Sequence, residues 1–388
     1  MRELVALDLP GGPAFVAAVE AAWAAGDAVL PVDRRLPAPA RDELLAAARP
    51  HAVVTDDGRS PAGPSMSSRR VALDRAGPRV DEGDAVVVAT SGTTGEPKLV
   101  VHTHAGVAAH ANAVHAHLEV DPARDRWLAC LPLAHLGGLG VVLRSIVTGT
   151  PVDVIPTFDA RAVAAAPADL GTTLVSLVPT ALDRLDAGAF RWVVLGGSGD
   201  PGHRPPNVVR TYGLTETGGG VVYDGRPLPG VEVRLAADGA VALRGPILAR
   251  GRRRPDGTVD PITGADGWFP TGDLGTWSED GRLHVHGRGD DLIVTGGENV
   301  WPGPVEAALA GHAGVAEVAV VGRDDAEWGR RVVAVVVPGD RAAPPTLEEL
   351  RDHVRATLPA HAAPRELVLV DRLPRTTLGK VRRRDLLP

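Results

Sequence analysis

A loop rich in glycine and hydroxyl side chains, ending in a lysine, is the segment of the sequence with the clearest chemical character. Directly after the apolar run 85–89 stand Thr90, Ser91, Gly92, Thr93, Thr94, Gly95, Glu96, Pro97 and Lys98. Glycines let the backbone turn its N–H groups toward an anion, hydroxyls add donors, and the lysine adds a positive charge. The loop therefore predicts a phosphate-binding site. Its glycine–lysine spacing, with no Ser or Thr after Lys98, disfavours a P-loop NTPase.

Lysine is rare in this chain and indicates a second reactive position. Only Lys98 and Lys380 are lysines among the 41 lysine and arginine residues. Where arginine serves as the general cation, a remaining lysine suggests a need for a compact, mobile ammonium group. Lys380 is a catalytic candidate, because a point cation relieves the repulsion when a carboxylate meets a phosphate. The alternative is a solvated basic tail that Lys380 shares with residues 382–384.

Two acidic residues stand in segments rich in turn-forming residues. Glu216 lies beside two threonine hydroxyls and suits Mg²⁺ that is bound to phosphates. Asp273, in a Thr-Gly-Asp segment, has acceptor oxygens for both hydroxyls of a ribose, and Arg288 can complete that contact. A structural salt bridge between two loops is the alternative for Asp273 and Arg288. Gly197 and Ser198 follow an apolar run, where a glycine lets a nucleotide approach the backbone.

Alternating strands and helices are expected to position these segments over the first 200 residues. We predict helices over 13–25, 40–48, 105–118 and 139–147, and strands over 28–32, 85–89, 126–131, 151–155, 173–177 and 192–195. We predict a loop over 53–70, which glycine, proline and serine interrupt. This alternation is typical of a mainly parallel sheet that helices cover on both faces.

The rest of the chain differs in pattern. From residue 221, short strands (231–235, 240–243 and 282–286) predict a small antiparallel subdomain. Beyond a boundary at 287–291 we expect helices over 304–310 and 346–358 and strands over 315–321, 331–337 and 366–370, with Thr346 capping the second helix. The predicted fold is a large N-terminal α/β domain, residues 1–289, followed by a small, mobile α+β domain, residues 290–388. A length of 388 residues supports two domains.

Charge and composition exclude several classes of protein. A net charge of −7 disfavours a general nucleic-acid binder. The sequence has no apolar run of roughly 18 residues, as a membrane span needs, and its start lacks a secretory signal. Its one cysteine, Cys130, allows no internal disulfide. A cytoplasmic protein is expected, and a homodimer is left open.

Five motifs, in this order, resemble those of the acyl-adenylating (AMP-binding) superfamily of acyl-CoA synthetases, peptide-synthetase adenylation domains and luciferases. They are the loop 90–98, Tyr212-Gly213-Leu214-Thr215-Glu216, the segment 267–273 that ends in Asp273, the stretch 287–298, and the segment 373–380 that ends in Lys380. The resemblance implies an enzyme that activates a carboxylic acid with ATP and Mg²⁺ as an acyl-AMP and passes the acyl group to coenzyme A. No internal repeat or further motif competes with it.

The resemblance also implies roles for particular residues. Tyr212 and Gly213 would face the adenine, and Lys380, Thr215 and Glu216 would act in adenylation. Asp290 would be the hinge about which the C-terminal domain rotates, and Gly296 and Gly297 would line the tunnel for the pantetheine of CoA. Val294 departs from the pattern, since many members have a lysine there.

Within this family, two stretches are most similar to the o-succinylbenzoate–CoA ligases of menaquinone synthesis. They are 131–145, which contains His135 and Arg144, and 218–225, which begins with Gly218 and Gly219. The glycines leave room for a ring, and His135 and Arg144 offer partners for the second carboxylate of o-succinylbenzoate. A packing or gating histidine and a cation on a helix surface are the alternatives for these two residues.

Three other functions stay open at the level of the sequence. One is an aryl- or fatty-acyl-CoA ligase, which a pocket without a cation would favour. Another is an adenylation enzyme that loads a separate carrier protein. The third is an inactive relative with a binding or regulatory role, which the intact Thr94, Glu216, Asp273 and Lys380 disfavour.

Overall fold

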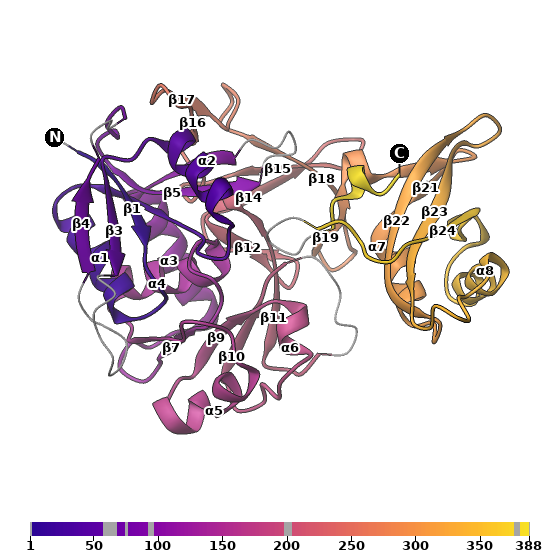
Figure 1. Ribbon diagram of the computed structural model, residues 1–388, viewed down its shortest axis with the longest axis horizontal. Coiled ribbons are helices and arrows are strands. Elements are labelled where there is room, and N and C mark those ends of the chain that lie inside the picture. Colours follow the sequence, from indigo (N-terminus) through magenta and orange to yellow (C-terminus); the bar gives the residue numbers. More distant parts are fainter. Residues whose placement is uncertain are drawn as a thin grey trace. The chain divides into compact units, whose positions relative to one another are not determined.

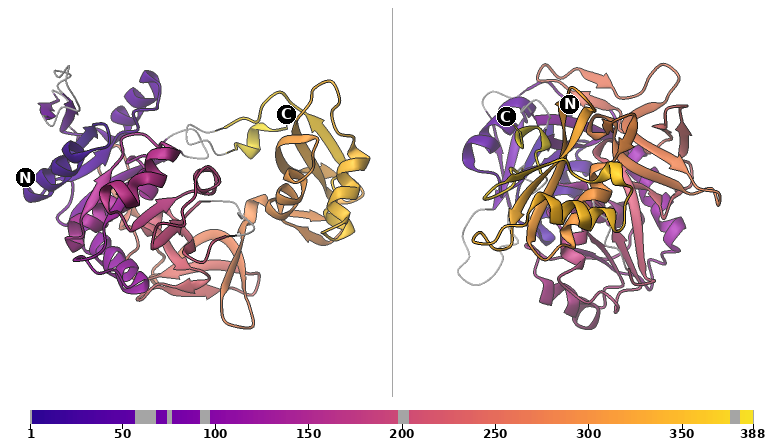
Figure 2. Two further views of the ribbon diagram at one scale, coloured as in Figure 1. Left: turned by 90° about the horizontal axis from the view of Figure 1, so that it is seen from below. Right: turned by 90° about the vertical axis from the view of Figure 1, so that its right-hand side faces the viewer.

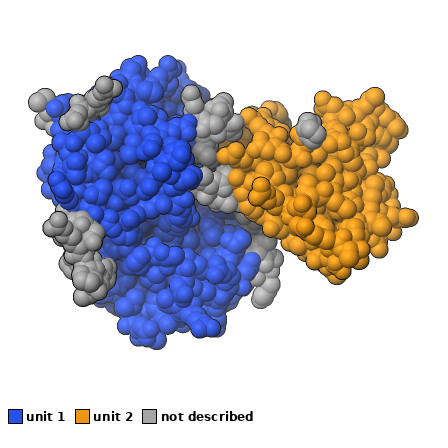
Figure 3. Space-filling view, in the orientation of Figure 1, with its two compact units in different colours: residues 1–234, 243–270, 279–282 blue, residues 235–242, 271–278, 283–388 orange. Residues whose placement is uncertain are grey.

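The computed structural model describes residues 2–56, 68–73, 77–91, 97–197, 204–375 and 381–387. Two compact units make up the chain (Figure 3). The first holds residues 1–234, 243–270 and 279–282, and the second holds 235–242, 271–278 and 283–388. The long C-terminal stretch of the second unit thus begins a few residues before the expected boundary at 289/290. The predicted movement of residues 290–388 as one mobile domain stays a prediction.

The first sheet of unit 1 has eight strands and is parallel at its centre. In sheet order they are β17 (Val259–Pro261), β16 (Gly251–Arg253), β6 (Pro97–Thr103), β5 (Asp84–Ser91), β2 (Ala28–Pro31), β1 (Leu4–Asp8), β3 (Ala52–Asp56) and β4 (Ser68–Ala72). Strands β5, β2, β1 and β3 pair in parallel, and β6, β16, β17 and β4 extend both edges in antiparallel fashion. The run Ala85–Val88 is fully buried, as its apolar sequence predicted.

The second sheet of unit 1 has seven strands. In sheet order they are β13 (Arg226–Pro227), β12 (Gly219–Tyr223), β11 (Val208–Leu214), β10 (Trp192–Leu195), β9 (Leu174–Leu177), β7 (Trp127–Ala129) and β8 (Val152–Val154). Pairing is parallel from β8 to β11 and antiparallel from β11 to β13. The mainly parallel arrangement expected from the alternation of strands and helices is therefore confirmed.

Helices fill the space between these sheets and cover their outer faces (Figure 1). The helices α1 (Pro13–Ala24), α3 (His104–Leu118) and α4 (Leu136–Thr148) share one buried apolar cluster with strands of both sheets. Outside the first sheet lies α2 (Ala38–Ala48), and outside the second lie α5 (Ala160–Leu170) and the short α6 (Pro179–Leu182). Within the described residues, no helix is long and apolar enough to cross a membrane.

The local structure differs from the sequence prediction in two places. The segment 97–103 is strand β6, whereas no strand was predicted between the loop 90–98 and the helix 105–118. The expected loop over 53–70 contains most of β3 and the start of β4, which pair with each other. In both cases the tertiary partner strand decides the conformation of a segment whose own sequence is broken by turn-forming residues.

The small sheet expected after residue 221 is present, and its last two strands pair in antiparallel fashion, as predicted. Its order is β14 (Glu232–Leu235), β15 (Ala240–Arg244), β18 (Phe269–Trp277) and β19 (Leu283–Arg288), and the division between the two units runs through it.

Unit 2 also contains the predicted α+β fold. Its five-stranded sheet contains β20 (Ile293–Thr295), β21 (Glu298–Val300), β22 (Val315–Asp325), β23 (Gly329–Pro338) and β24 (Glu366–Leu369). The helices α7 (Pro302–Ala310) and α8 (Leu347–Arg355) pack on one face of this sheet (Figures 1 and 2). Thr346 caps α8 in a capping box with Glu349, as the sequence indicated.

Candidate active site

The predicted phosphate loop is the tip of the β5–β6 hairpin. Thr90 pairs with Lys98, and Ser91 pairs with Pro97, so the two strands converge on the loop. Gly92, Thr93, Thr94 and Gly95 lie outside the described residues. The hairpin places Thr90 and Lys98 opposite each other at the mouth of the loop, as a phosphate site requires.

One face of β6 connects this loop to the predicted magnesium residue. Side chains alternate along a strand, so Lys98, Val100 and His102 share a face. On that face the Nε2 atom of His102 lies 2.8 Å from the carbonyl oxygen of Thr215. Thr215 and Glu216 form the short 3₁₀ turn η1 (Thr215–Thr217) at the end of β11. The strand that carries Lys98 therefore also holds the turn that carries Glu216.

Glu216 makes an ion pair with an arginine of a distant strand. The Nη2 atom of Arg252 donates to Oε1 of Glu216 over 2.6 Å, and the Glu216 side chain is only 15% exposed. Arg252 stands in β16, directly opposite Val100 of β6. No local pattern signals this contact, because it depends on the pairing of two strands 150 residues apart in the sequence.

The residues around Glu216 fit a magnesium ion that arrives with its phosphates. Within the described part of the chain, no group of three His, Cys, Asp or Glu side chains could hold a metal ion. Mg²⁺ in nucleotide sites takes one or two carboxylates and completes its shell with phosphate oxygens and water. One well-placed carboxylate, Glu216, meets that requirement.

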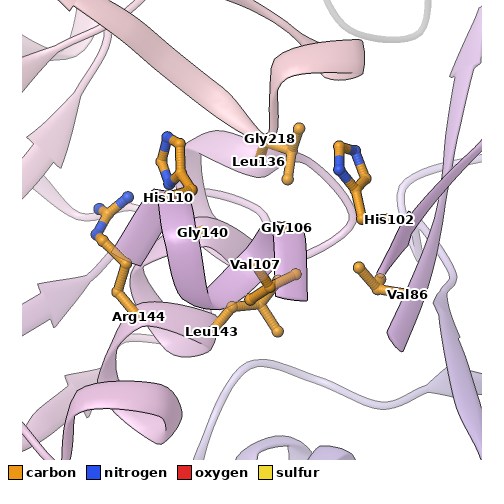
Figure 4. A pocket seen from close by; sticks show the side chains of 10 residues that line it. All are labelled: Val86, His102, Gly106, Val107, His110, Leu136, Gly140, Leu143, Arg144 and Gly218. Atoms are coloured by element: carbon orange, nitrogen blue, oxygen red, sulfur yellow. The ribbon is translucent and has the colours of Figure 1, made fainter. Parts of the chain in front are cut away.

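Beside this turn, α3 and α4 line a narrow pocket (Figure 4). Its walls contain Val86, His102, Gly106, Val107, His110, Leu136, Gly140, Leu143, Arg144 and Gly218. The free space is about 20 Å³, which is room for one water molecule, so an aromatic acid would have to displace side chains to bind here. In Figure 4, His110 and Arg144 lie close together, and His102 lies on the other side of Gly218.

Arg144 is a buried cation at the wall of this pocket. Its residue is 5% exposed, and its guanidinium lies 4.6 Å from the centre of the Trp127 ring. Its Nη2 reaches the hydroxyl of Ser176 over 3.4 Å, whereas its Nε has no hydrogen-bond partner. No carboxylate of the described residues pairs with it, and burial lowers the pKa of its guanidinium. The alternative of a cation on a helix surface is wrong for Arg144.

Histidines surround this arginine without adding charge. Burial lowers the pKa of His110 to about 3, with a further contribution from Arg144, and burial lowers the pKa of His102 to about 4. Both are neutral at pH 7. The Nε2 atom of His110 lies 3.0 Å from the carbonyl oxygen of Gly220, so His102 and His110 hold the two ends of the segment 215–220. Arg144 is thus the one ionised side chain among the residues that line the pocket.

His135, the other residue expected to meet the acid, has a different partner. Its Nε2 lies 3.1 Å from Oδ2 of Asp33, a nearly buried carboxylate that also binds Arg35. Burial favours a raised pKa for Asp33, but hydrogen bonds from Arg35 and His135 outweigh it and leave that pKa well below its usual range. His135 is not among the residues that line the pocket. Its predicted contact with the substrate finds no support in this geometry.

The predicted glycines of the site stand where backbone segments approach closely. Gly218 and Gly219 have positive φ angles of 72° and 125°, and a Cβ atom on Gly218 would lie 3.8 Å from both His102 and His110. Gly213 lies in β11, where a Cβ atom would be 1.9 Å from the carbonyl oxygen of Gly219. Larger side chains at these positions would displace the segment that holds Glu216.

The predicted adenine-binding residues lie at the ends of neighbouring parallel strands. Tyr212 is half-buried in β11 and pairs in register with Val222. Gly197 follows β10, with a φ of 100°, and Ser198 lies outside the described residues. Because β10 and β11 are parallel neighbours, their C-terminal ends meet at one edge of the sheet, where α/β proteins bind nucleotides.

In unit 2, the structure brings the predicted ribose pair together. Asp273 and Arg288 face each other across β18 and β19, with Nε of Arg288 3.2 Å from Oδ1 of Asp273. Nη1 of Arg288 also donates to the carbonyl oxygen of Thr271 over 2.6 Å. The Asp273 carboxylate is nearly buried, and Arg288 is half exposed. The two residues pair between strands rather than loops.

The remaining predicted residues of unit 2 keep roles that stay predictions. Gly296 and Gly297 form the two-residue turn between β20 and β21, with φ angles of 60° and 83°, a conformation that demands glycine or a similar residue whatever ligand lies nearby. Asp290 is exposed in the 3₁₀ turn η2 (Gly289–Asp291). Lys380 lies outside the described residues.

Comparison with known proteins decides the family. The model of the AMP-binding enzyme family matches residues 2–251, and the model of the AMP-binding enzyme C-terminal domain matches residues 304–380. The chain belongs to the AMP-binding enzyme family. The superfamily to which its five motifs were assigned is thereby confirmed.

Relatives of this AMP-binding enzyme point to one group within the family. A probable 2-succinylbenzoate–CoA ligase of Mycobacterium tuberculosis is 44% identical over 342 residues, which are 80% of this chain and 86% of the relative. The 2-succinylbenzoate–CoA ligase of Bacillus licheniformis is 35% identical over 339 residues, 78% of this chain and 69% of the relative.

Among solved structures, the o-succinylbenzoate CoA synthetase of Bacillus subtilis bound to its acyl-adenylate intermediate has a TM-score of 0.84 at 26% identity. That match covers 100% of this chain and 88% of the other. The same enzyme has also been solved with ATP and a magnesium ion, and that structure has a TM-score of 0.83 to this chain.

Proposed function

We propose that this AMP-binding enzyme joins o-succinylbenzoate to coenzyme A, with ATP and Mg²⁺, through an o-succinylbenzoyl-adenylate. The relatives named 2-succinylbenzoate–CoA ligase and the similar structure of an o-succinylbenzoate CoA synthetase support both the class of reaction and the acid. In the first step the acid's carboxylate attacks the α-phosphorus of ATP and pyrophosphate leaves. In the second step the thiol of CoA replaces AMP on the acyl carbon.

Arg144 is the observation that carries the choice of acid. o-Succinylbenzoate has two carboxylates, and only one becomes the thioester, so the other keeps its negative charge through both steps. Burying that charge is costly unless a cation meets it. Arg144 is a buried guanidinium with an unused Nε donor and neutral histidines beside it, which is the complement of such a carboxylate.

The other residues would act on the nucleotide. Lys98 and the loop 90–98 would hold the phosphates, with Glu216 as the protein ligand of Mg²⁺. When bound, Mg²⁺ neutralises charge on the phosphates as pyrophosphate leaves. Asp273 and Arg288 would contact the ribose, and Tyr212 the adenine. Lys380 would lie between the acid and the α-phosphate.

Thioester formation with a panel of acids tests this proposal. The purified protein is incubated with ATP, Mg²⁺, CoA and one acid, either o-succinylbenzoate, benzoate, a medium-chain fatty acid or acetate, and the products are measured by mass spectrometry. We expect a CoA thioester with o-succinylbenzoate and little with the others. A thioester formed only with another acid would keep the reaction class and refute the proposed substrate. An acyl-adenylate that forms without any CoA thioester would favour an enzyme that loads a separate carrier protein.

A further inference from the structure

The ion pair between Arg252 and Glu216 occupies the carboxylate that the proposed function assigns to Mg²⁺. It is a close contact of 2.6 Å between a guanidinium that is 42% exposed and a carboxylate that is 15% exposed. A metal ion that approaches Glu216 with its triphosphate must therefore also approach Arg252. Arg252 can then either stay paired with Glu216 beside the metal or leave Glu216 for another acceptor. The hydrogen-bond donors that Arg252 does not use for Glu216 decide which of these two states is favourable.

Arg252 keeps most of its hydrogen-bonding capacity unused. A guanidinium has five N–H donors, and the described contacts of Arg252 use one, from Nη2 to Glu216. Its Nε is buried and has no partner. Such a donor costs free energy until it finds an acceptor. A phosphate oxygen near Glu216 would supply one.

The neighbouring arginines of β16 and its flanks are committed elsewhere. Arg250 forms two 2.9 Å hydrogen bonds to the buried carboxylate of Asp84. Arg253 donates to backbone carbonyl oxygens, including that of Arg79, and Arg254 pairs with Asp260. Among these four arginines, Arg252 is therefore the one whose Nε is buried without a hydrogen-bond partner.

The strand register places Arg252 with the phosphate loop. Arg252 stands opposite Val100, and Val100 lies two residues from Lys98 on the same face of β6. Arg252 and Lys98 thus share one face of the sheet where β5 and β6 meet the predicted phosphate loop. Glu216 completes the group, because η1 rests against this face through the contact of His102 with Thr215.

We propose that Arg252 binds the β- and γ-phosphates of ATP, and the pyrophosphate that they become, by exchanging Glu216 for phosphate oxygens as the metal takes Glu216. This inference rests on the proposed use of ATP and names a further phosphate-binding residue for the same reaction. Guanidinium binds phosphate with two parallel hydrogen bonds, which an ammonium cannot do. Before ATP binds, the ion pair keeps Glu216 neutralised and in place.

Nucleotide binding by Arg252→Gln tests the proposal apart from the chemistry of any acid. The dissociation constants of ATP, pyrophosphate and AMP are measured by calorimetry, with Arg254→Gln as a matched neighbouring control. We expect Arg252→Gln to weaken ATP and pyrophosphate roughly 10- to 100-fold, which is the range for charge-assisted hydrogen bonds, and to leave AMP unchanged. Arg252→Lys should recover part of the ATP affinity. Equal affinities of wild type and Arg252→Gln for ATP would overturn the proposal.

A second comparison separates direct contact from support of Glu216. Arg252→Gln is introduced into Glu216→Gln, and ATP binding is measured in EDTA, where neither the metal nor the Glu216 charge can act. Direct contact predicts that ATP still binds more weakly to the double variant than to Glu216→Gln, with AMP unaffected. Identical ATP affinities would show that Arg252 acts only through Glu216. Wild type that binds no ATP even in the presence of Mg²⁺ would instead refute the proposed function.

Discussion

Arg144 is expected to affect both the stability of the fold and the choice of acid, and one substitution can separate these two effects. A buried charge without a carboxylate partner is costly, and replacing it by an apolar side chain of similar volume is often neutral or stabilising. We expect Arg144→Met to keep or raise the melting temperature, while KM for o-succinylbenzoate rises roughly 10- to 100-fold and ATP binding is unchanged.

Steady-state kinetics and thermal unfolding of the same preparation measure both effects of Arg144→Met. A melting temperature lowered by several degrees, together with an unchanged KM for the acid, would show that Arg144 is a structural residue.

The buried histidines predict how stability depends on pH. Their pKa values in the folded state, about 4 for His102 and His115 and about 3 for His110, lie below the ordinary value of 6.5. Between pH 6.5 and the folded-state pKa, these histidines are protonated in the unfolded chain but neutral in the folded chain. The free energy of unfolding is therefore highest above pH 6.5 and decreases as the pH falls. Each histidine lowers the free energy of unfolding by up to about 1.4 kcal/mol per pH unit over that interval.

Replacing one of these histidines should make the free energy of unfolding depend less steeply on pH. Gln in place of His110 can still donate to the carbonyl of Gly220 but cannot be protonated. Urea unfolding is measured between pH 5 and 7.5. The free energy of unfolding should fall less steeply with decreasing pH for His110→Gln than for wild type, by up to about 1.4 kcal/mol per pH unit, the slope that one proton contributes. A slope equal to that of wild type would mean that His110 does not resist protonation in the folded chain.

At the scale of single residues, chemical type was predictable and partners were not. The phosphate loop, Glu216, Asp273 and Arg288 stood out because their residue types and spacing suit one chemistry. Arg252, the partner of Glu216, stands 36 residues away in the sequence. Asp33, the partner of His135, stands 102 residues away. No local pattern encodes such contacts, which is why neither the contact of His135 with Asp33 nor that of Arg252 with Glu216 was predicted.

The turn that carries Glu216 depends on the close approach of β11 and β12. A Cβ atom on Gly213 would lie 1.9 Å from the carbonyl oxygen of Gly219, so Gly213→Ala must push the two strands apart. We expect a loss of roughly 1–3 kcal/mol of stability from the overpacking, and a fall in ATP–pyrophosphate exchange because Glu216 moves with its turn.

The matched control for Gly213→Ala is Gly303→Ala in α7, where an added Cβ meets no atom within 4 Å and alanine favours the helix. That variant should keep full exchange activity and equal or higher stability. If Gly213→Ala behaved like the control, the register between β11 and β12 would not be what positions Glu216.

Elements were predictable wherever one continuous pattern spans them. Apolar runs located β5 and β10, and the Thr346–Glu349 spacing located the start of α8. Strand β6 begins with Pro97 and Lys98 at the end of the phosphate loop, and β3 and β4 flank a segment broken by glycine and proline. These strands exist because edge and neighbour strands pair with them, a condition that their own residues do not express.

For the whole molecule, the family implies that one lysine in the small domain serves the first step only. We expect Lys380→Ala to abolish measurable adenylation of o-succinylbenzoate while the variant still converts supplied o-succinylbenzoyl-AMP and CoA to the thioester. Arg382→Ala, a change two residues away in the same basic segment, should impair neither step. Equal, small effects of both substitutions on adenylation would favour the solvated basic tail that the sequence left open for Lys380.

The acyl-adenylate itself tests the account most directly. Stoichiometric enzyme is mixed with ATP, Mg²⁺ and o-succinylbenzoate without CoA, quenched, and examined by mass spectrometry, and a second portion is chased with CoA before quenching. We expect one o-succinylbenzoyl-AMP and one pyrophosphate for each active site, and the chase should convert the adenylate to o-succinylbenzoyl-CoA and AMP. Formation of ADP and phosphate, or a thioester without any preceding adenylate, would contradict it.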